Sequence, residues 1–390
     1  MNTAMKTVWT FGILTLLAGA AQAQPILVSK AADLLKNKQI DAAKTAIDAA
    51  SVNPASVNDP RTWYYKGFIY KELFKQDPVK NQDARVQSVD FFKKSISLDK
   101  TNEYTSDCKQ NVRFIANTYL QDGTDLFNTK QYKEVKTPLR AYANHIRFAE
   151  PSAFNSEIYS FIGFAEEMTG GADSAIFYYE KALTAGFHDA LLFDNLANLY
   201  HDKHNDAKAI QVLEKGIKLY PSDGKLAISE VNILMASNKV VEAETKIEKA
   251  IALNPKNIDL YLVQGTALDR LAKLKPTDKE KYFDKRLTAY QKVLEIDPNH
   301  FSANYNMGIT LYNRAVDIIN DQSYDLDVTL LTKVIDDCSI LFKRAMPYLE
   351  KAHKLTPTNK NTLVALEGIY YNLSDAEKMK TVQGKLSNMK

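Results

Sequence analysis

The pattern of apolar and polar positions repeats along the middle of this chain. Small or apolar residues recur at Ala197, Val231 and Gly265, each 34 residues after the last. Ala209 and Ala243 follow the first two at an offset of 12 residues. Apolar positions at helical spacing within each unit predict two amphipathic helices per unit. A fixed period of this length predicts a helical solenoid, in which each hairpin buries its apolar face against its neighbours.

The repeated first-helix position can be traced toward both ends of the chain. It is occupied in turn by Ala31, Gly67, Gly123, Gly163, Ala197, Val231, Gly265, Gly308 and Glu367. Prolines close several units, as at Pro221, Pro255 and Pro298. We therefore expect an all-α solenoid of about nine antiparallel helix hairpins.

The residues around this position resemble the tetratricopeptide repeat family, whose first helix carries a bulky residue, then Gly or Ala, then an aromatic residue or Leu. The matching triplets are Trp63/Gly67/Tyr70, Tyr119/Gly123/Leu126, Phe193/Ala197/Tyr200 and Tyr261/Gly265/Leu268. The second helix carries small, bulky and small residues at Ser88/Phe92/Ser95, Ala175/Tyr179/Ala182 and Ala345/Leu349/Ala352. The resemblance implies a right-handed superhelix. We expect the large residue of one hairpin to fill the gap left by the small residue of the next.

Three hairpins are longer than the standard unit, with extra residues at 75–87, 272–283 and 318–340. The first two inserts are polar and contain Pro78 and Pro276, which predicts loops.

The third insert has a different pattern. Its apolar residues alternate at spacings of three and four: Val328, Leu331, Ile335, Cys338, Phe342, Ala345, Leu349 and Ala352. This heptad seam predicts an elongated helical hairpin around residues 301–356, either as a binding element or as extra packing. A polar helix over residues 374–390, with Ser374 as its N-cap, is expected to cap the solenoid.

The first 23 residues have the pattern of a secretory signal peptide. Lys6 precedes an apolar run, and small residues end at Ala21-Gln22-Ala23. The run is too short to span a bilayer, which takes about 20 apolar residues. We expect cleavage near Ala23, a single solenoid over residues 24–390, and a periplasmic or secreted protein. The segments at 62–67 and 369–371 also resemble exported tetratricopeptide proteins of Gram-negative bacteria.

Charge and cysteine content narrow the function further. The chain has 50 Lys and Arg against 47 Asp and Glu, a net charge of +3. Because both signs are interspersed along the helices, no nucleic-acid binding is expected. Cys108 and Cys338 fall on apolar faces and lie five repeats apart, so we expect small buried side chains and no disulfide between them.

The sequence contains no motif of a common enzyme class or cofactor site. G-x-S-x-G, H-E-x-x-H, G-x-G-x-x-G and the P-loop are all missing. His201 and His204 are the one close histidine pair, and no third metal ligand is nearby. We therefore expect no enzyme, no cofactor and no metal.

The family resemblance implies that the first helices line a concave groove. The residues expected to point into it are Tyr64, Phe68, Lys71, Leu120, Phe127, Phe164, Asn198, His201, Asn232, Met235, Tyr305 and Tyr312. Aromatic ends supply anchoring area, and asparagines can pair with both polar groups of an extended backbone.

Two functions follow from these patterns. The first is a non-enzymatic scaffold or adaptor that binds a protein or peptide outside the cytoplasm, in an outer-membrane-associated complex. The alternative is a carbohydrate-binding accessory protein of the outer membrane, since aromatic faces stack on sugars.

Overall fold

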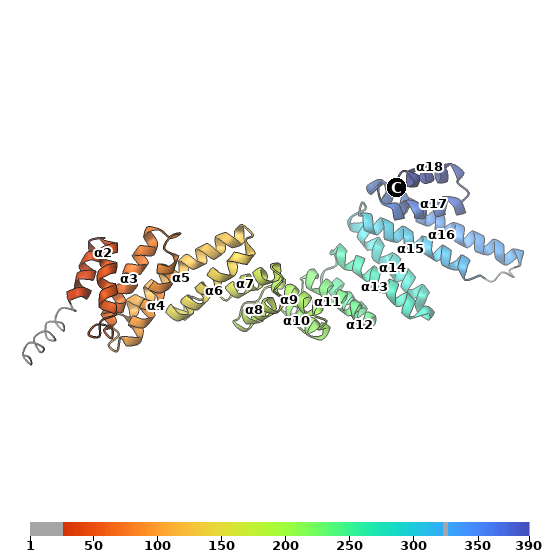
Figure 1. Ribbon diagram of the computed structural model, residues 1–390. Helices are drawn as coiled ribbons and strands as arrows, with labels where there is room; N and C mark the ends of the chain where they lie inside the picture. Colours follow the sequence, from red (N-terminus) through yellow and green to blue (C-terminus); the bar gives the residue numbers. More distant parts are fainter. Residues whose placement is uncertain (1–25, 323–326, 390) are drawn as a thin grey trace, which may run out of the picture. The chain divides into compact units, whose positions relative to one another are not determined.

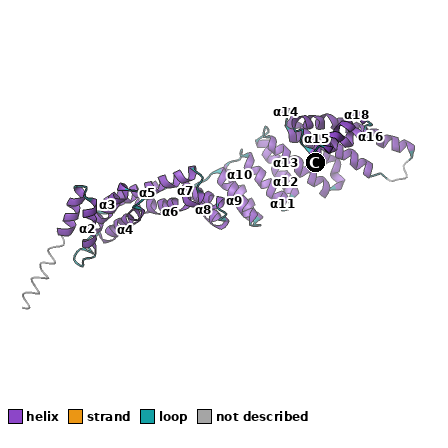
Figure 2. Ribbon diagram, turned by 45° about the horizontal axis from the view of Figure 1, so that its top comes forward, coloured by secondary structure: helices purple, strands orange, loops and turns teal. Residues whose placement is uncertain are grey.

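The computed structural model describes residues 26–322 and 327–389, and the expected signal peptide lies outside these residues. Within them, every regular element is a helix and no strand occurs (Figure 2). The expected all-α fold is confirmed.

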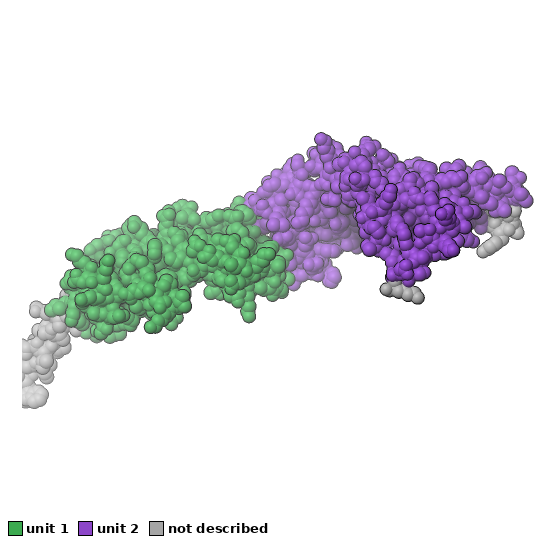
Figure 3. Space-filling view, turned by 90° about the horizontal axis from the view of Figure 1, so that it is seen from above, with its two compact units in different colours: residues 1–187 green, residues 188–390 purple. Residues whose placement is uncertain are grey.

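The chain divides into two compact units, residues 1–187 and 188–390 (Figure 3). The described part of the first unit contains four hairpins. They are a helical segment at 26–36 with α2 (Ile40–Ser51), α3 (Pro60–Gln76) with α4 (Gln82–Leu98), α5 (Thr105–Asn128) with α6 (Tyr132–Ala149), and α7 (Glu157–Met168) with α8 (Ala172–Thr184). A short 3-10 turn, η1 (Pro151–Ala153), joins the third hairpin to the fourth.

The described part of the second unit contains five hairpins (Figure 1). They are α9 (Ala190–Asp202) with α10 (Asp206–Leu219), α11 (Gly224–Ala236) with α12 (Val240–Leu253), α13 (Ile258–Leu274) with α14 (Lys279–Ile296), α15 (Phe301–Asn320) with α16 (Val328–Leu355), and α17 (Lys360–Asn372) with α18 (Ala376–Ser387). The residue pattern thus predicted the hairpins. That all of them form one solenoid stays a prediction.

Several hairpins are closed by a large side chain of the second helix that packs on the small residue of the first helix. A Cβ atom added to Gly67 would lie 2.7 Å from the Phe92 ring, and one added to Gly163 would lie 2.8 Å from the Tyr179 ring. Phe92 and Tyr179 belong to the same hairpins as the glycines they cover. The expectation that the large residue comes from the preceding hairpin was wrong at these two glycines, because the two helices of one hairpin approach most closely there.

The inserts at 75–87 and 272–283 are mostly helical, which corrects the prediction of loops. Only residues 77–81 separate α3 from α4, and α14 begins directly after the short turn η2 (Pro276–Asp278). The extra turns are stable because they bury apolar side chains, among them Phe74 and Ala84 in one hairpin and Leu271 and Tyr282 in the other.

The third insert lengthens both helices of the α15–α16 hairpin, although its heptad seam is buried only in part. Cys338 and Phe342 are buried against the core of the second unit. Val328, Leu331 and Ile335 are 79%, 45% and 57% exposed, so the first turns of α16 lie outside that core.

Two smaller expectations have different outcomes. Ser374 is not an N-cap: it has a positive φ of 57°, and the neighbouring Asp375 side chain accepts the capping hydrogen bond from the Lys378 N–H. Cys108 and Cys338 are both buried and free, as expected.

The glycine contacts predict a large stability effect at one position. Gly163→Val should lower the free energy of unfolding by roughly 1–3 kcal/mol, because the new side chain must displace the Tyr179 ring. Chemical denaturation followed by circular dichroism measures this change.

The matched control is Gly384→Ala in α18. Nothing lies within 4 Å of a Cβ at Gly384, so this substitution should leave stability unchanged or raise it by about 0.5–1 kcal/mol. Equal losses in the two variants would contradict the proposed packing.

A buried cationic group holds α4 against α5 and lies near α6. Arg85 is 1% exposed, and its guanidinium lies 3.4 Å from the centre of the Tyr119 ring. Its Nη1 donates a 2.5 Å hydrogen bond to Asp122. His145 packs on the other side of this cluster, with its ring centre 5.6 Å from that of Tyr119. Burial, with the nearby charges of Lys93 and Arg85, lowers the pKa of His145 to about 4.

His145 should therefore make stability depend on pH. Its folded-state pKa is depressed, so the stability that the neutral ring contributes is complete above about pH 6.5 and is lost as pH falls toward about 4. Between pH 7.5 and 4.5 the wild type should lose about 1–2 kcal/mol more than His145→Gln, a figure that allows for solvent screening. Denaturation at both pH values measures this, with His188→Gln as the exposed-histidine control. Identical losses in wild type and His145→Gln would contradict the assignment.

Candidate functional site

The groove residues predicted on α3 contact the next first helix, α5. The Tyr64 hydroxyl donates to Asp107 at 2.5 Å, and Lys71 Nζ donates to Asn111 at 2.7 Å. Lys71 also lies 4.5 Å from the Phe68 ring centre, and burial lowers the pKa of its ammonium group. These three side chains are half-buried; Tyr64 and Lys71 join neighbouring hairpins, whereas Phe68 packs on Phe92 of its own hairpin.

The other predicted residues of the first unit form an aromatic cluster. Phe127 lies with its ring centre 5.8 Å from Phe164, and Tyr132 and Phe161 contact the same group. Leu120 is half-buried about two turns earlier on α5. The structure thus brings the predicted residues Phe127 and Phe164 together. Their rings pack against each other within the cluster.

In the second unit, Asn198 and Asn232 are exposed at equivalent positions of α9 and α11. The His201 Nδ1 atom lies 2.6 Å from the Asp206 carboxylate, and Ser237, directly after α11, donates a hydrogen bond to the same carboxylate. These two hydrogen bonds, that of Ser237 first, lower the pKa of Asp206. Met235 is buried at 7% exposure and is therefore not available to a ligand.

The two predicted tyrosines of α15 have different surroundings. The Tyr305 ring stacks on Phe301 with centres 6.0 Å apart, and burial raises the pKa of its hydroxyl. Tyr312 packs against Phe342 and closely against Gly368 of α17, so it joins two hairpins. That the predicted residues bind a peptide stays a prediction.

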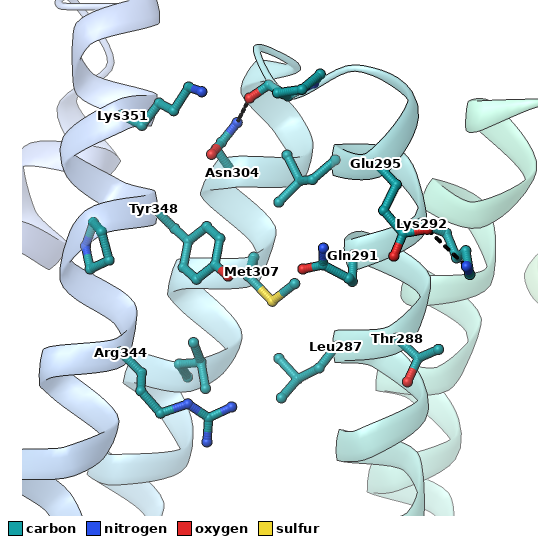
Figure 4. A pocket seen from close by; sticks show the side chains of 14 residues that line it. Leu287, Thr288, Gln291, Lys292, Glu295, Asn304, Met307, Arg344, Tyr348 and Lys351 are labelled. Atoms are coloured by element: carbon teal, nitrogen blue, oxygen red, sulfur yellow. Dashed lines mark hydrogen bonds and ion pairs between the residues drawn. The ribbon is translucent and has the colours of Figure 1, made fainter.

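A groove of about 950 Å³ lies between two second helices, α14 and α16, with α15 as its floor. Its apolar lining is Leu287, Leu294, Met307, Leu311, Pro298 and Pro347. Figure 4 shows Tyr348 from α16 and Gln291 from α14 pointing toward Met307 from opposite sides. Helix geometry places Met307 and Leu311 on the side of α15 away from Tyr305 and Tyr312, so this groove is distinct from the predicted one.

The polar rim of this α14–α16 groove carries an excess of positive charge. On α14, Lys292 and Glu295 pair with each other at 2.8 Å. On α16, Arg344 and Lys351 make no ion pair within the residues that the structure describes. The groove therefore combines an apolar floor with two available cations on one wall.

Second helices also border two smaller grooves. One of about 770 Å³ lies between α16 and α18 and shares Pro347 and Lys351 with the α14–α16 groove. One of about 310 Å³ lies between α10 and α12. Grooves between successive second helices are thus a repeated feature of the second unit, and the one at α14–α16 has the largest volume of these three.

Reasoning from the sequence missed this groove, although a signal was present. Arg344, Tyr348 and Lys351 are spaced by four and three residues, which places them on one face of a helix. The family resemblance places the ligand site on the first helices, so no prediction was made for this face of a second helix.

The described residues give no support for metal chemistry or a membrane span. Among them, no group of three or more His, Cys, Asp or Glu side chains is placed to hold a metal ion. None of the described helices is long and apolar enough to cross a bilayer.

The hairpin series and its interhelical grooves define a helical-repeat protein. Residues 192–223, which cover α9 and α10, match the family model of the tetratricopeptide repeat. The α9–α10 hairpin is therefore similar to one tetratricopeptide repeat. No curated protein matches its sequence.

Several solved structures are similar to this one. The C-terminal part of a TPR repeat-containing protein from Cytophaga hutchinsonii has 17% identity and a TM-score of 0.46, covering 78% of this chain and 99% of that one. A tetratricopeptide repeat protein from Parabacteroides merdae has 14% identity and a TM-score of 0.43, covering 70% and 93%. YrrB, described as a TPR protein with an unusual peptide-binding site, has 19% identity and a TM-score of 0.37, covering 54% and 92%.

Proposed function

We propose that this protein is a non-enzymatic scaffold that binds a segment of a partner protein in the α14–α16 groove. The observation that carries the proposal is the groove itself, which is open, about 950 Å³ in volume and apolar at its floor. Specific sites in proteins combine an apolar floor with a few placed polar groups, and Gln291 and Tyr348 are such groups here.

The dimensions of the groove suit a peptide segment. Two helices and a floor helix form an elongated trough, in which a partner helix or extended strand has anchoring positions along its length. Tyr348 supplies a rigid aromatic surface with a hydroxyl group, the kind of side chain enriched at binding hot spots.

The first-helix face of the second unit is a secondary contact in this proposal. Asn198 and Asn232 are exposed one repeat apart. Their side-chain amides can donate hydrogen bonds to, and accept them from, the backbone of an extended peptide. A peptide site on the first helices requires such groups.

Site-specific photocrosslinking tests the groove. A benzoylphenylalanine at Gln291 should give a discrete adduct with a partner protein in cells that make this protein. The same residue at Val241, which is 52% exposed on α12, is the matched control and should not give that adduct. Tyr348→Ala should weaken the Gln291 adduct at least several-fold, because the aromatic anchor is lost. Identical adducts from positions 291 and 241 would overturn the site.

We also propose that the protein is exported. The pattern over residues 1–23 supports this, with Lys6, an apolar run and the Ala21-Gln22-Ala23 end. In a Gram-negative host, mass spectrometry of the mature protein should find Gln24 as the first residue, and osmotic shock should release the protein. Replacing Ala21 and Ala23 with bulky residues should retain the longer form. An uncleaved wild-type protein in the cytoplasm would contradict export.

A further inference from the structure

Ion pairs connect successive second helices across most of the second unit. Lys246 of α12 lies 2.9 Å from Glu214 of α10. Lys285 of α14 lies 2.8 Å from Glu244 and 3.0 Å from Glu248, both on α12. We call this series the second-helix ladder.

The ladder continues beyond α16 and is interrupted before it. Lys378 of α18 lies 3.0 Å from Glu350 of α16. Between α14 and α16, however, no ion pair joins the two helices within the described residues. The interruption coincides with the α14–α16 groove, which has the largest volume of the three grooves described above.

One position accounts for the interruption. The residue directly after the large core residue of each second helix is Glu214 after Leu213, Glu248 after Ile247 and Glu350 after Leu349. Each of these glutamates accepts a bridge from the next second helix. In α14 the residue after Tyr290 is Gln291, which carries no charge.

The cation that would complete the missing step is present. Lys285 precedes Tyr290 by five residues, and Arg344 precedes Leu349 by five, so the two occupy equivalent positions. Lys285 has two glutamate partners on the preceding second helix, whereas Arg344 faces Leu287 and Gln291 at the corresponding positions. Lys351 adds a second cation to the same wall.

We propose that the partner segment supplies the missing acid: the α14–α16 groove takes an acidic amphipathic peptide segment. Its carboxylates meet Arg344 and Lys351, and its apolar side chains lie on the partly exposed Leu287, Leu294 and Tyr348. Charge complementarity on the wall and the apolar area of the groove select such a segment over a neutral one. This inference rests on the proposed function and adds the chemical class of the ligand.

Two labelled peptides probe the inference with the full-length mature chain. The first is a helical 16-residue peptide with leucines along one face and glutamates beside them, and the second has every glutamate replaced by glutamine. Fluorescence anisotropy should show tighter binding of the acidic peptide, by roughly tenfold in Kd. This preference should shrink when the salt concentration rises from 0.05 to 0.5 M.

Three variants separate the groove from general electrostatics. Arg344→Gln should remove most of the preference for the acidic peptide. Gln291→Glu should do the same, because it gives Arg344 an acid within the chain. Lys249→Gln, which removes an exposed cation from α12, should leave the preference unchanged. Circular dichroism confirms that each variant keeps its helices.

The outcomes distinguish the inference from the proposed function. Equal affinities for both peptides, or no binding of either, would overturn the acidic ligand. The scaffold proposal would still stand if Gln291 gives its photocrosslinked adduct, and both would fail without that adduct. If Lys249→Gln weakened the preference for the acidic peptide as much as Arg344→Gln does, the net charge of the protein would explain the preference. That result would overturn the site. A concentration-dependent dimer that competes with the acidic peptide would assign the groove to a second copy of the chain.

Discussion

The close approach of two helices at a small residue is the contact on which the rest of this structure depends. Gly67 under Phe92 and Gly163 under Tyr179 allow each hairpin to close without a gap. Because such a hairpin still exposes one apolar face, it is stable only against its neighbours. Each hairpin therefore also supplies one side of its interface with the next hairpin. The large residues point into the hairpin, which leaves the positions directly after them to face the neighbouring second helix.

That arrangement explains how the chain tolerates inserts. The turn between two helices lies at the end of a hairpin, away from the glycine contact, so added residues extend the helices and do not disturb the interface. Residues such as Phe74 and Tyr282 cover the added turns. On α16 the lengthening exceeds what the neighbours can cover, which leaves Val328 and Ile335 exposed.

The sequence predicted the hairpins because their determinants are local and periodic, as the row of small residues from Ala31 to Gly308 shows. The sequence did not predict which helix covers Gly67, because residue spacing alone does not indicate which large side chain lies nearest to the glycine. The prediction of loops at the inserts was wrong because it rested on their proline and charge, whereas Ala84 and Tyr282 within them are buried on helices. Among the predicted groove residues, Met235 and Tyr312 were assigned from an idealised first helix, whereas the local packing of α11 and of α17 covers them.

The proposed site in the α14–α16 groove depends on a position at which the sequence departs from the repeat pattern. A row of glutamates on successive second helices pairs with cations of the next helix, and such exposed pairs contribute little stability individually. Replacing one of them with Gln291 therefore costs the fold little, yet it leaves Arg344 without an acid beside an apolar trough. A periodic scaffold is suited to this kind of change, because neighbouring hairpins continue to fix both walls. In the proposed site, the loss of one surface ion pair thus leaves a cation that a ligand of opposite charge can meet.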